Sequence, residues 1–174
     1  MDTQNPTADT LGAHLPDPGV DSRVELFVKT LAPVENYAAQ DRLVSTLTEL
    51  EARDALGGFT ITVWGDRICT EGELSTVDCG KHIVETIGDF YAFAADEGIS
   101  ISQFFTNRTV SASLSGQSFN CIVPPNQCTA MYQGDELVGV FPCVIDGEVY
   151  TVRDAIERFE VAALEDSPET PTLE

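Results

Sequence analysis

Lysine is almost absent from this chain of 174 residues, because only Lys29 and Lys81 occur beside seven arginines. The 29 aspartates and glutamates therefore give a formal net charge of −20 and a pI near 4.1. Repulsion among so many carboxylates strains a compact fold in dilute buffer, whereas molar salt, with a screening length of about 3 Å, relieves that strain. This charge and the shortage of lysine predict a cytoplasmic protein of an organism that accumulates salt.

Long apolar runs are missing as well. No uninterrupted apolar stretch approaches the roughly 18 residues that a membrane-spanning helix needs. The first residues also lack the basic and apolar regions of an export signal. Hydrophobic residues make up 43% of the sequence, which excludes global disorder. The sequence therefore predicts a soluble protein that is not exported and that has one packed core.

Cysteine and histidine are too sparse and too irregularly spaced to form a known metal motif. The five cysteines are Cys69, Cys79, Cys121, Cys128 and Cys143. No C-x-x-C pair is present to anchor tetrahedral zinc, and Cys79 with His82 supplies half of a site at most. A metal or redox loop between Cys121 and Cys128 is the alternative. We expect reduced core thiols, with no metal, no cofactor and no obligatory disulfide.

Catalytic motifs are also missing from the sequence. G-x-S-x-G, G-x-G-x-x-G and the P-loop pattern do not occur. His14 falls in the N-terminal tail, so His82 is the one histidine that the folded domain offers as a base. Its helical spacing from Cys79 rarely produces a nucleophile in a cleft. No catalytic residue is predicted, and a thiol-dependent enzyme that uses a cysteine with His82 ranks third among the functions considered.

Two segments with little apolar periodicity flank one predicted domain. Residues 1–22 are rich in proline and glycine, and residues 164–174 are acidic and contain two prolines. Both segments are predicted to be disordered acidic tails. A single domain is therefore predicted over residues 23–163.

Hydrophobic patterns within that domain predict a β-α-β-α order, then a β-meander and a C-terminal helix. Alternation predicts strands at residues 24–29 and 59–63, and helical spacing predicts helices from Pro33 and Ser75. Short alternating runs follow from residue 107, and a capping box at Thr151 begins the last helix. A mixed β-sheet with its helices packed on one face is the simplest arrangement, which gives an α+β fold class.

The corner Trp64-Gly65-Asp66-Arg67 is the one candidate binding site in the sequence. It follows a predicted strand and holds the only tryptophan of the chain. A ligand or a protein partner could contact Trp64, Asp66 and Arg67 there, since loops on a rigid scaffold often carry function. The favoured alternative is structural: the tryptophan caps the core and Arg67 neutralises a neighbouring carboxylate.

The arginines form no basic stripe that would indicate a nucleic-acid site. They are scattered among acids at Arg42, Arg53, Arg108, Arg153 and Arg158. In dilute buffer this pattern argues against binding to nucleic acid. At molar salt the release of counterions contributes little, so a DNA-binding protein relies on direct contacts and on bridging cations. The charge pattern therefore makes DNA a less favoured partner without excluding it.

Several short segments carry a resemblance to a known family: Arg23 to Pro33, Val63 to Arg67, Phe104-Phe105, Val140 to Cys143 and Val149 to Val152. In these segments the chain resembles a family of small acidic haloarchaeal proteins. Members of that family are described as helix-turn-helix domain proteins without an established activity, and the resemblance covers about residues 23–159. It implies a non-enzymatic regulatory protein that acts in transcription, with DNA or another protein as its partner.

The runner-up function is a small-molecule sensor or a protein-binding adaptor that acts through the Trp64 corner. No residue role is carried over from the family. The reason is that the first predicted helix is followed by a strand, whereas the motif requires a short turn and a second helix.

Overall fold

The computed structural model describes residues 7–31, 37–69, 78–111 and 114–166. Its elements, in chain order, are α1 (Thr7–Gly12), β1 (Gly19–Val28), α2 (Tyr37–Ala52), β2 (Leu56–Val63), β3 (Ile68–Cys69), α3 (Asp78–Glu97), the 3₁₀ helix η2 (Ser102–Phe104), β4 (Thr106–Ser111), β5 (Ser118–Val123), β6 (Gln127–Gln133), β7 (Glu136–Phe141), β8 (Cys143–Ile145), β9 (Glu148–Tyr150) and α4 (Val152–Asp166). The mixture of helices with parallel and antiparallel strands confirms the predicted α+β class.

The centre of the fold is a mixed four-stranded sheet with the strand order β2-β1-β6-β7. Strands β1 and β2 are parallel, and α2 makes the crossover that two adjacent parallel strands require. Strand β6 pairs antiparallel with β1 on the other side and forms a hairpin with β7. Gly134, at a φ of 61°, lies in the turn of that hairpin, where a left-handed backbone favours glycine.

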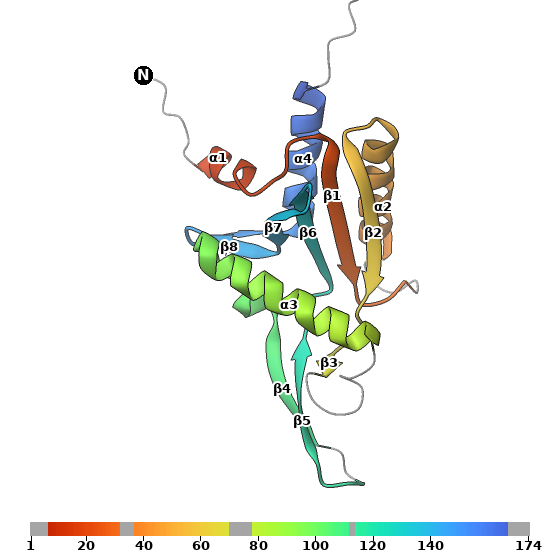
Figure 1. Cartoon of the computed structure of the whole chain (residues 1–174), viewed down its shortest axis with the longest axis vertical. Helices are drawn as coiled ribbons and strands as arrows, with labels where there is room; N and C mark the ends of the chain where they lie inside the picture. Colours follow the sequence, from red (N-terminus) through yellow and green to blue (C-terminus); the bar gives the residue numbers. More distant parts are fainter. Residues whose placement is uncertain (1–6, 32–36, 70–77, 112–113, 167–174) are drawn as a thin grey trace, which may run out of the picture.

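Helices cover both faces of this sheet. In Figure 1, α3 crosses the front of the sheet, while α2 and α4 lie behind it. Successive side chains of β1 point to opposite faces, so Phe27 meets Phe90 of α3 at 5.6 Å between ring centroids, and Leu26 and Val28 face the other layer. The prediction that the helices pack on one face is therefore wrong. Strand β1 is buried on both sides, and each side needs an apolar cover.

The strands expected to form one meander divide among three sheets. Strands β6 and β7 join the central sheet, while β8 pairs with β9 and forms an isolated bridge from Val144 to Ser100. Strands β4 and β5 form a hairpin, and β5 also pairs with the short strand β3. This hairpin projects away from the body of the molecule in Figure 1, below α3.

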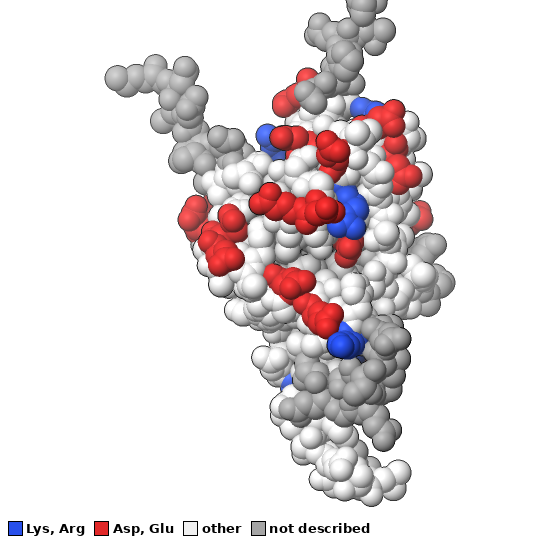
Figure 2. Space-filling view, viewed as in Figure 1, with Lys and Arg blue, Asp and Glu red and all other residues white. Residues whose placement is uncertain are grey.

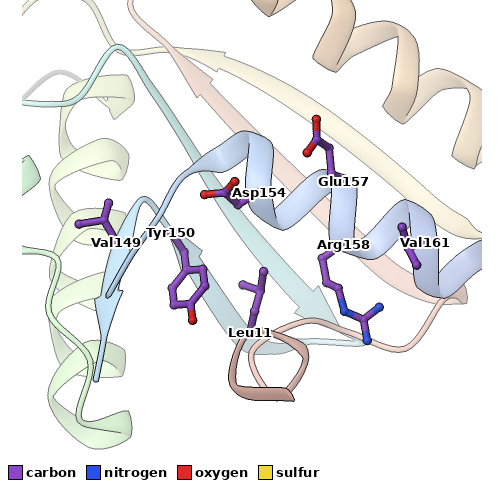
Figure 3. Close-up of a pocket in the computed structure, with 7 residues that line it drawn as sticks. All are labelled: Leu11, Val149, Tyr150, Asp154, Glu157, Arg158 and Val161. Atoms are coloured by element: carbon purple, nitrogen blue, oxygen red, sulfur yellow. The ribbon is translucent and has the colours of Figure 1, made fainter. Parts of the chain in front are cut away.

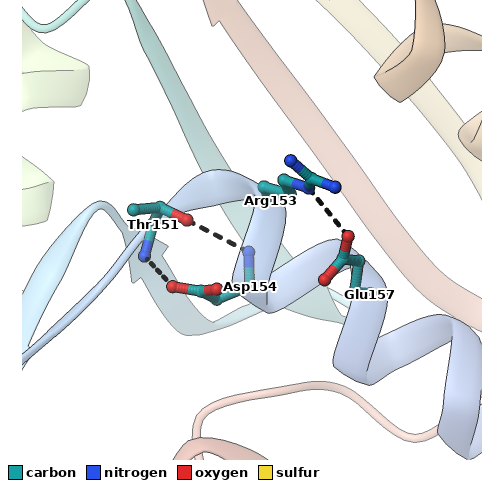
Figure 4. A network of polar contacts seen from close by, with 4 residues as sticks. All are labelled: Thr151, Arg153, Asp154 and Glu157. Carbon is teal, nitrogen blue, oxygen red and sulfur yellow. Dashed lines mark hydrogen bonds and ion pairs between the residues drawn. The ribbon is translucent and has the colours of Figure 1, made fainter. Parts of the chain in front are cut away.

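The predicted capping box at the start of α4 is confirmed. The backbone N–H of Asp154 donates to Oγ1 of Thr151 at 3.2 Å, and the N–H of Thr151 donates to Oδ2 of Asp154 at 2.9 Å (Figure 4). Two backbone N–H groups at the start of the helix thereby donate to side-chain oxygens. Arg153, in the same first turn, donates from Nε to Oε1 of Glu157, one turn further along α4, at 2.8 Å.

The N-terminal segment differs from the predicted tail. Residues 7–12 form α1 and β1 begins at Gly19, although residues 1–22 are predicted to be disordered. Leu11 is buried, and the carbonyl of His14 lies where a Cβ on Gly139 of β7 would stand. These contacts tie the segment to α4 and β7 despite its prolines. Residues 1–6 and 167–174, and the predicted helix starts at Pro33 and Ser75, lie outside the described residues.

Candidate functional site

The projecting hairpin is the part of the surface where the charge pattern changes. Residues 98–134, which include β4 and β5, contain none of the 29 acidic residues and one basic residue, Arg108. Figure 2 shows carboxylates over the upper body of the molecule and none on the white surface of its lower end. We call β4, β5 and their connection the acid-free hairpin. Sequence reasoning missed it, although counting acids along the chain would have found it.

Hydroxyl and amide groups dominate the exposed surface of the acid-free hairpin. Thr109 donates to Oδ1 of Asn120 across the two strands at 3.3 Å, and the hydroxyl oxygens of Ser111 and Ser118 lie 3.5 Å apart. Arg108 is exposed on β4, where its Cα is paired with that of Cys121. The hairpin therefore presents hydrogen-bonding groups and one positive charge, in a molecule whose other surfaces are rich in carboxylates.

The helix that packs beside the hairpin presents a different surface. The apolar side of α3 is buried through Ile87, Phe90 and Ala94. Its exposed acids are Glu85, Asp89, Asp96 and Glu97. Carboxylates repel phosphate groups, so the outer face of α3 is a poor surface for nucleic acid.

The Trp64 corner divides into a buried and an exposed part. The Trp64 side chain is 5% exposed, stacks on Phe27 at 5.0 Å between ring centroids and meets the ring of Phe105 edge-on. Its indole nitrogen is buried and finds no hydrogen-bond partner among the residues that the structure describes. Asp66 and Arg67 are exposed, and among the described residues Arg67 has no carboxylate within ion-pair distance. The structure therefore keeps the tryptophan in the core and leaves two charged residues for any partner.

The four cysteines whose side chains the structure describes fall into two groups. Cys128 and Cys143 are fully buried, and burial raises the pKa of both thiols, to about 12 for Cys143. Cys69 and Cys121 are directly paired across β3 and β5, and their sulfur atoms lie 3.1 Å apart. Cys79 belongs to α3, but its side chain lies outside the described part of the chain.

Among the described side chains, no histidine lies with the cysteines in one cluster suited to metal binding or catalysis. His82 is exposed on α3. Within the described residues, no group of three or more His, Cys, Asp or Glu side chains could hold a metal ion. The alternative of a metal or redox loop between Cys121 and Cys128 finds no support, because Cys121 faces Cys69 and Cys128 is paired with Phe27 in the central sheet.

An open groove of about 370 Å³ lies between α1, α4 and the end of β9. Leu11, Val149, Tyr150 and Val161 supply its apolar lining, and Asp154, Glu157 and Arg158 its charged lining (Figure 3). In the described part of the molecule, one guanidinium nitrogen of Arg158 is buried without a hydrogen-bond partner. Two carboxylates, those of Asp154 and Glu157, line the groove together with Arg158. The groove therefore has a net negative charge, which does not favour binding of an anion.

The fold and the hairpin define an α+β protein with one carboxylate-free projection. A family model described as a helix-turn-helix domain matches residues 17–164. The chain belongs to this helix-turn-helix family, which confirms that part of the sequence resemblance. The comparisons with curated proteins and with solved structures find no match. No helix of the described residues has the length and apolar character needed to cross a membrane.

The described residues do not contain the element order for which the family is named. Helix α1 leads into β1, α2 into β2, and α3 through η2 into β4, so no α-helix directly follows another in the described chain. A helix-turn-helix motif places a second helix in the major groove after a short turn. The element that projects from the body of this molecule is the β4–β5 hairpin, which follows α3, and not a second helix.

Proposed function

We propose that this protein is a DNA-binding transcriptional regulator that contacts DNA with the acid-free hairpin. The observation that carries the proposal is the lack of any carboxylate over residues 98–134 in a chain of net charge −20. Phosphates repel carboxylates, so a DNA contact in such a protein belongs where the acids are missing. Membership of the helix-turn-helix family supports the same function.

The chemistry of the hairpin suits a DNA groove. A two-stranded β-ribbon fits the major groove of B-form DNA. Hydroxyl and amide side chains such as those of Thr109, Ser118 and Asn120 donate hydrogen bonds to phosphates and to base edges. Arg108 adds a guanidinium that pairs with a phosphate or with the acceptor edge of guanine. Direct hydrogen bonds of this kind persist at salt concentrations where counterion release contributes little.

The proposal makes DNA the partner, assigns the chain no catalytic reaction and places it in the cytoplasm beside the chromosome. A sensor or adaptor that acts through the Trp64 corner is the competing function. Burial of Trp64 weakens that alternative, because a partner would meet only Asp66 and Arg67.

Chromatin immunoprecipitation from cells grown at their native salt concentration tests the proposal. We expect the wild-type protein to occupy discrete genomic sites and Arg108→Glu to lose them, since a carboxylate then stands among the phosphate contacts. Arg153→Glu is the matched control. It makes the same charge change at another exposed arginine, on α4, and should keep the sites.

Two results would contradict the proposal. The first is wild-type protein that shows no discrete genomic sites. The second is equal loss of occupancy in both arginine variants while both remain folded, which would mean that net charge and not the hairpin controls binding.

A further inference from the structure

Two cysteines at the base of the hairpin are positioned to form a bond. Cys69 of β3 and Cys121 of β5 are register partners in an antiparallel pair, and their sulfur atoms lie 3.1 Å apart. Directly opposed residues of antiparallel strands have Cα separations of about 4.5–5.5 Å, within the range that a disulfide spans. A disulfide bond measures about 2.05 Å, so the sulfurs need to approach by only about 1 Å.

The two thiols differ in access to solvent. Cys69 is half-buried, whereas the Cys121 side chain is 2% exposed. This difference suits a pair in which one thiol meets a small reagent and the other, behind it, completes the reaction. Cys128 and Cys143 lack such access, and burial in apolar surroundings keeps them protonated and unreactive.

We propose that Cys69 and Cys121 form a redox-active dithiol site that takes a low-molecular-weight disulfide as its oxidant. The Cys69 thiolate attacks one sulfur of the reagent, which breaks the reagent's S–S bond and releases one small thiolate. The Cys121 thiolate then attacks Sγ of Cys69, forms the intramolecular disulfide and releases the second small thiolate. The two protons lost by the cysteines protonate the released thiolates, and the two electrons reduce the reagent to two thiols.

Oxidation of this site would tie β3 covalently to β5. Strand β5 is one of the two strands of the acid-free hairpin, so the bond would fix the base of the hairpin to the segment that follows Trp64. The reaction itself does not depend on DNA binding, and its failure would leave the proposed function untouched.

The test is treatment of the folded full-length protein with excess cystine, followed by acid quenching, alkylation of free thiols and mass spectrometry. After alkylation, oxidised wild-type protein should carry three alkyl groups where the reduced protein carries five, with two hydrogen atoms lost to the disulfide and no cysteine adduct. Cys121→Ser should stop at a mixed disulfide on Cys69, and Cys69→Ser should neither form the bond nor carry an adduct at Cys121. Cys79→Ser, which keeps the pair, should react as the wild type does.

Peptide mapping of the oxidised wild-type protein makes the test independent of the folding of any variant. Tandem mass spectra of the cross-linked peptide should join Cys69 to Cys121, and a reductant should restore both thiols. The proposal is overturned if the wild type keeps all its thiols, if it retains a stable cysteine adduct, or if the cross-link joins another pair.

Discussion

Trp64 shows how a single side chain combines favourable packing with an unsatisfied polar group. Its ring stacks on Phe27 and meets Phe105, which is the packing of a core residue. Its indole N–H is nevertheless buried with no acceptor in the described part of the chain, and a buried unpaired donor costs free energy. The residue stabilises the fold through its apolar area and not through its polar group.

Replacement of the corner residues should separate stability from binding. We expect Trp64→Ala to lower the free energy of unfolding by about 3–5 kcal/mol, because it leaves a cavity in the core. Trp64→Phe should cost less, since it keeps a ring and removes the unpaired N–H. Arg67→Ala should cost less than about 1 kcal/mol, as is typical of an exposed charge. Denaturant unfolding at constant high salt measures all three, and a large loss in Arg67→Ala would contradict this account.

At the scale of elements, glycine positions show which segments belong to the packed domain. A Cβ on Gly139 of β7 would collide with the carbonyl of His14, so the segment between α1 and β1 can lie against β7 only because residue 139 has no side chain. Gly88 of α3 offers the opposite case, because a Cβ there would meet nothing within 4 Å.

These two glycines form a matched pair of alanine substitutions. Gly139→Ala should destabilise the protein by about 1–3 kcal/mol, because it overpacks a site lined by backbone. Gly88→Ala should stabilise it by about 0.5–1 kcal/mol, because alanine loses less conformational freedom within a helix. Thermal unfolding at fixed salt gives the sign of each change. A harmless Gly139→Ala would mean that the N-terminal segment is not packed against β7 in solution.

At the scale of the whole molecule, the charge of −20 sets the conditions under which the fold is stable. Among the described residues only two ion pairs are present, Arg23 with Glu25 and Arg153 with Glu157, so most carboxylates have no cation beside them. Their mutual repulsion is a property of the whole surface, and dissolved salt screens it.

We therefore expect the midpoint of thermal unfolding to rise as KCl increases from about 0.1 M to about 3 M, the range over which screening changes most. Circular dichroism at several salt concentrations measures this shift. A midpoint that stays the same across the series would contradict the interpretation of the charge as an adaptation to salt.

Local features of this protein could be read from the sequence, because their causes lie within a few neighbouring residues. Alternation over residues 24–29 and 59–63 indicates extended strands, and β1 and β2 contain all of these residues except Lys29. The capping box of Thr151 and Asp154 needs only their spacing of three, and α4 begins there. The α+β class follows from the order of such local elements.

Only the tertiary structure decided how distant segments meet. Three contacts join residues that are far apart in the chain. Strand β1 is covered on both faces, Trp64 is buried under Phe105, and the sulfur atoms of Cys69 and Cys121 lie 3.1 Å apart. The same holds for the projection of the acid-free hairpin away from the central sheet, which separates it from the carboxylates of the body. Hydrophobic periodicity indicates which face of an element is apolar but not what covers that face, because the covering element is selected by the packing of the whole chain.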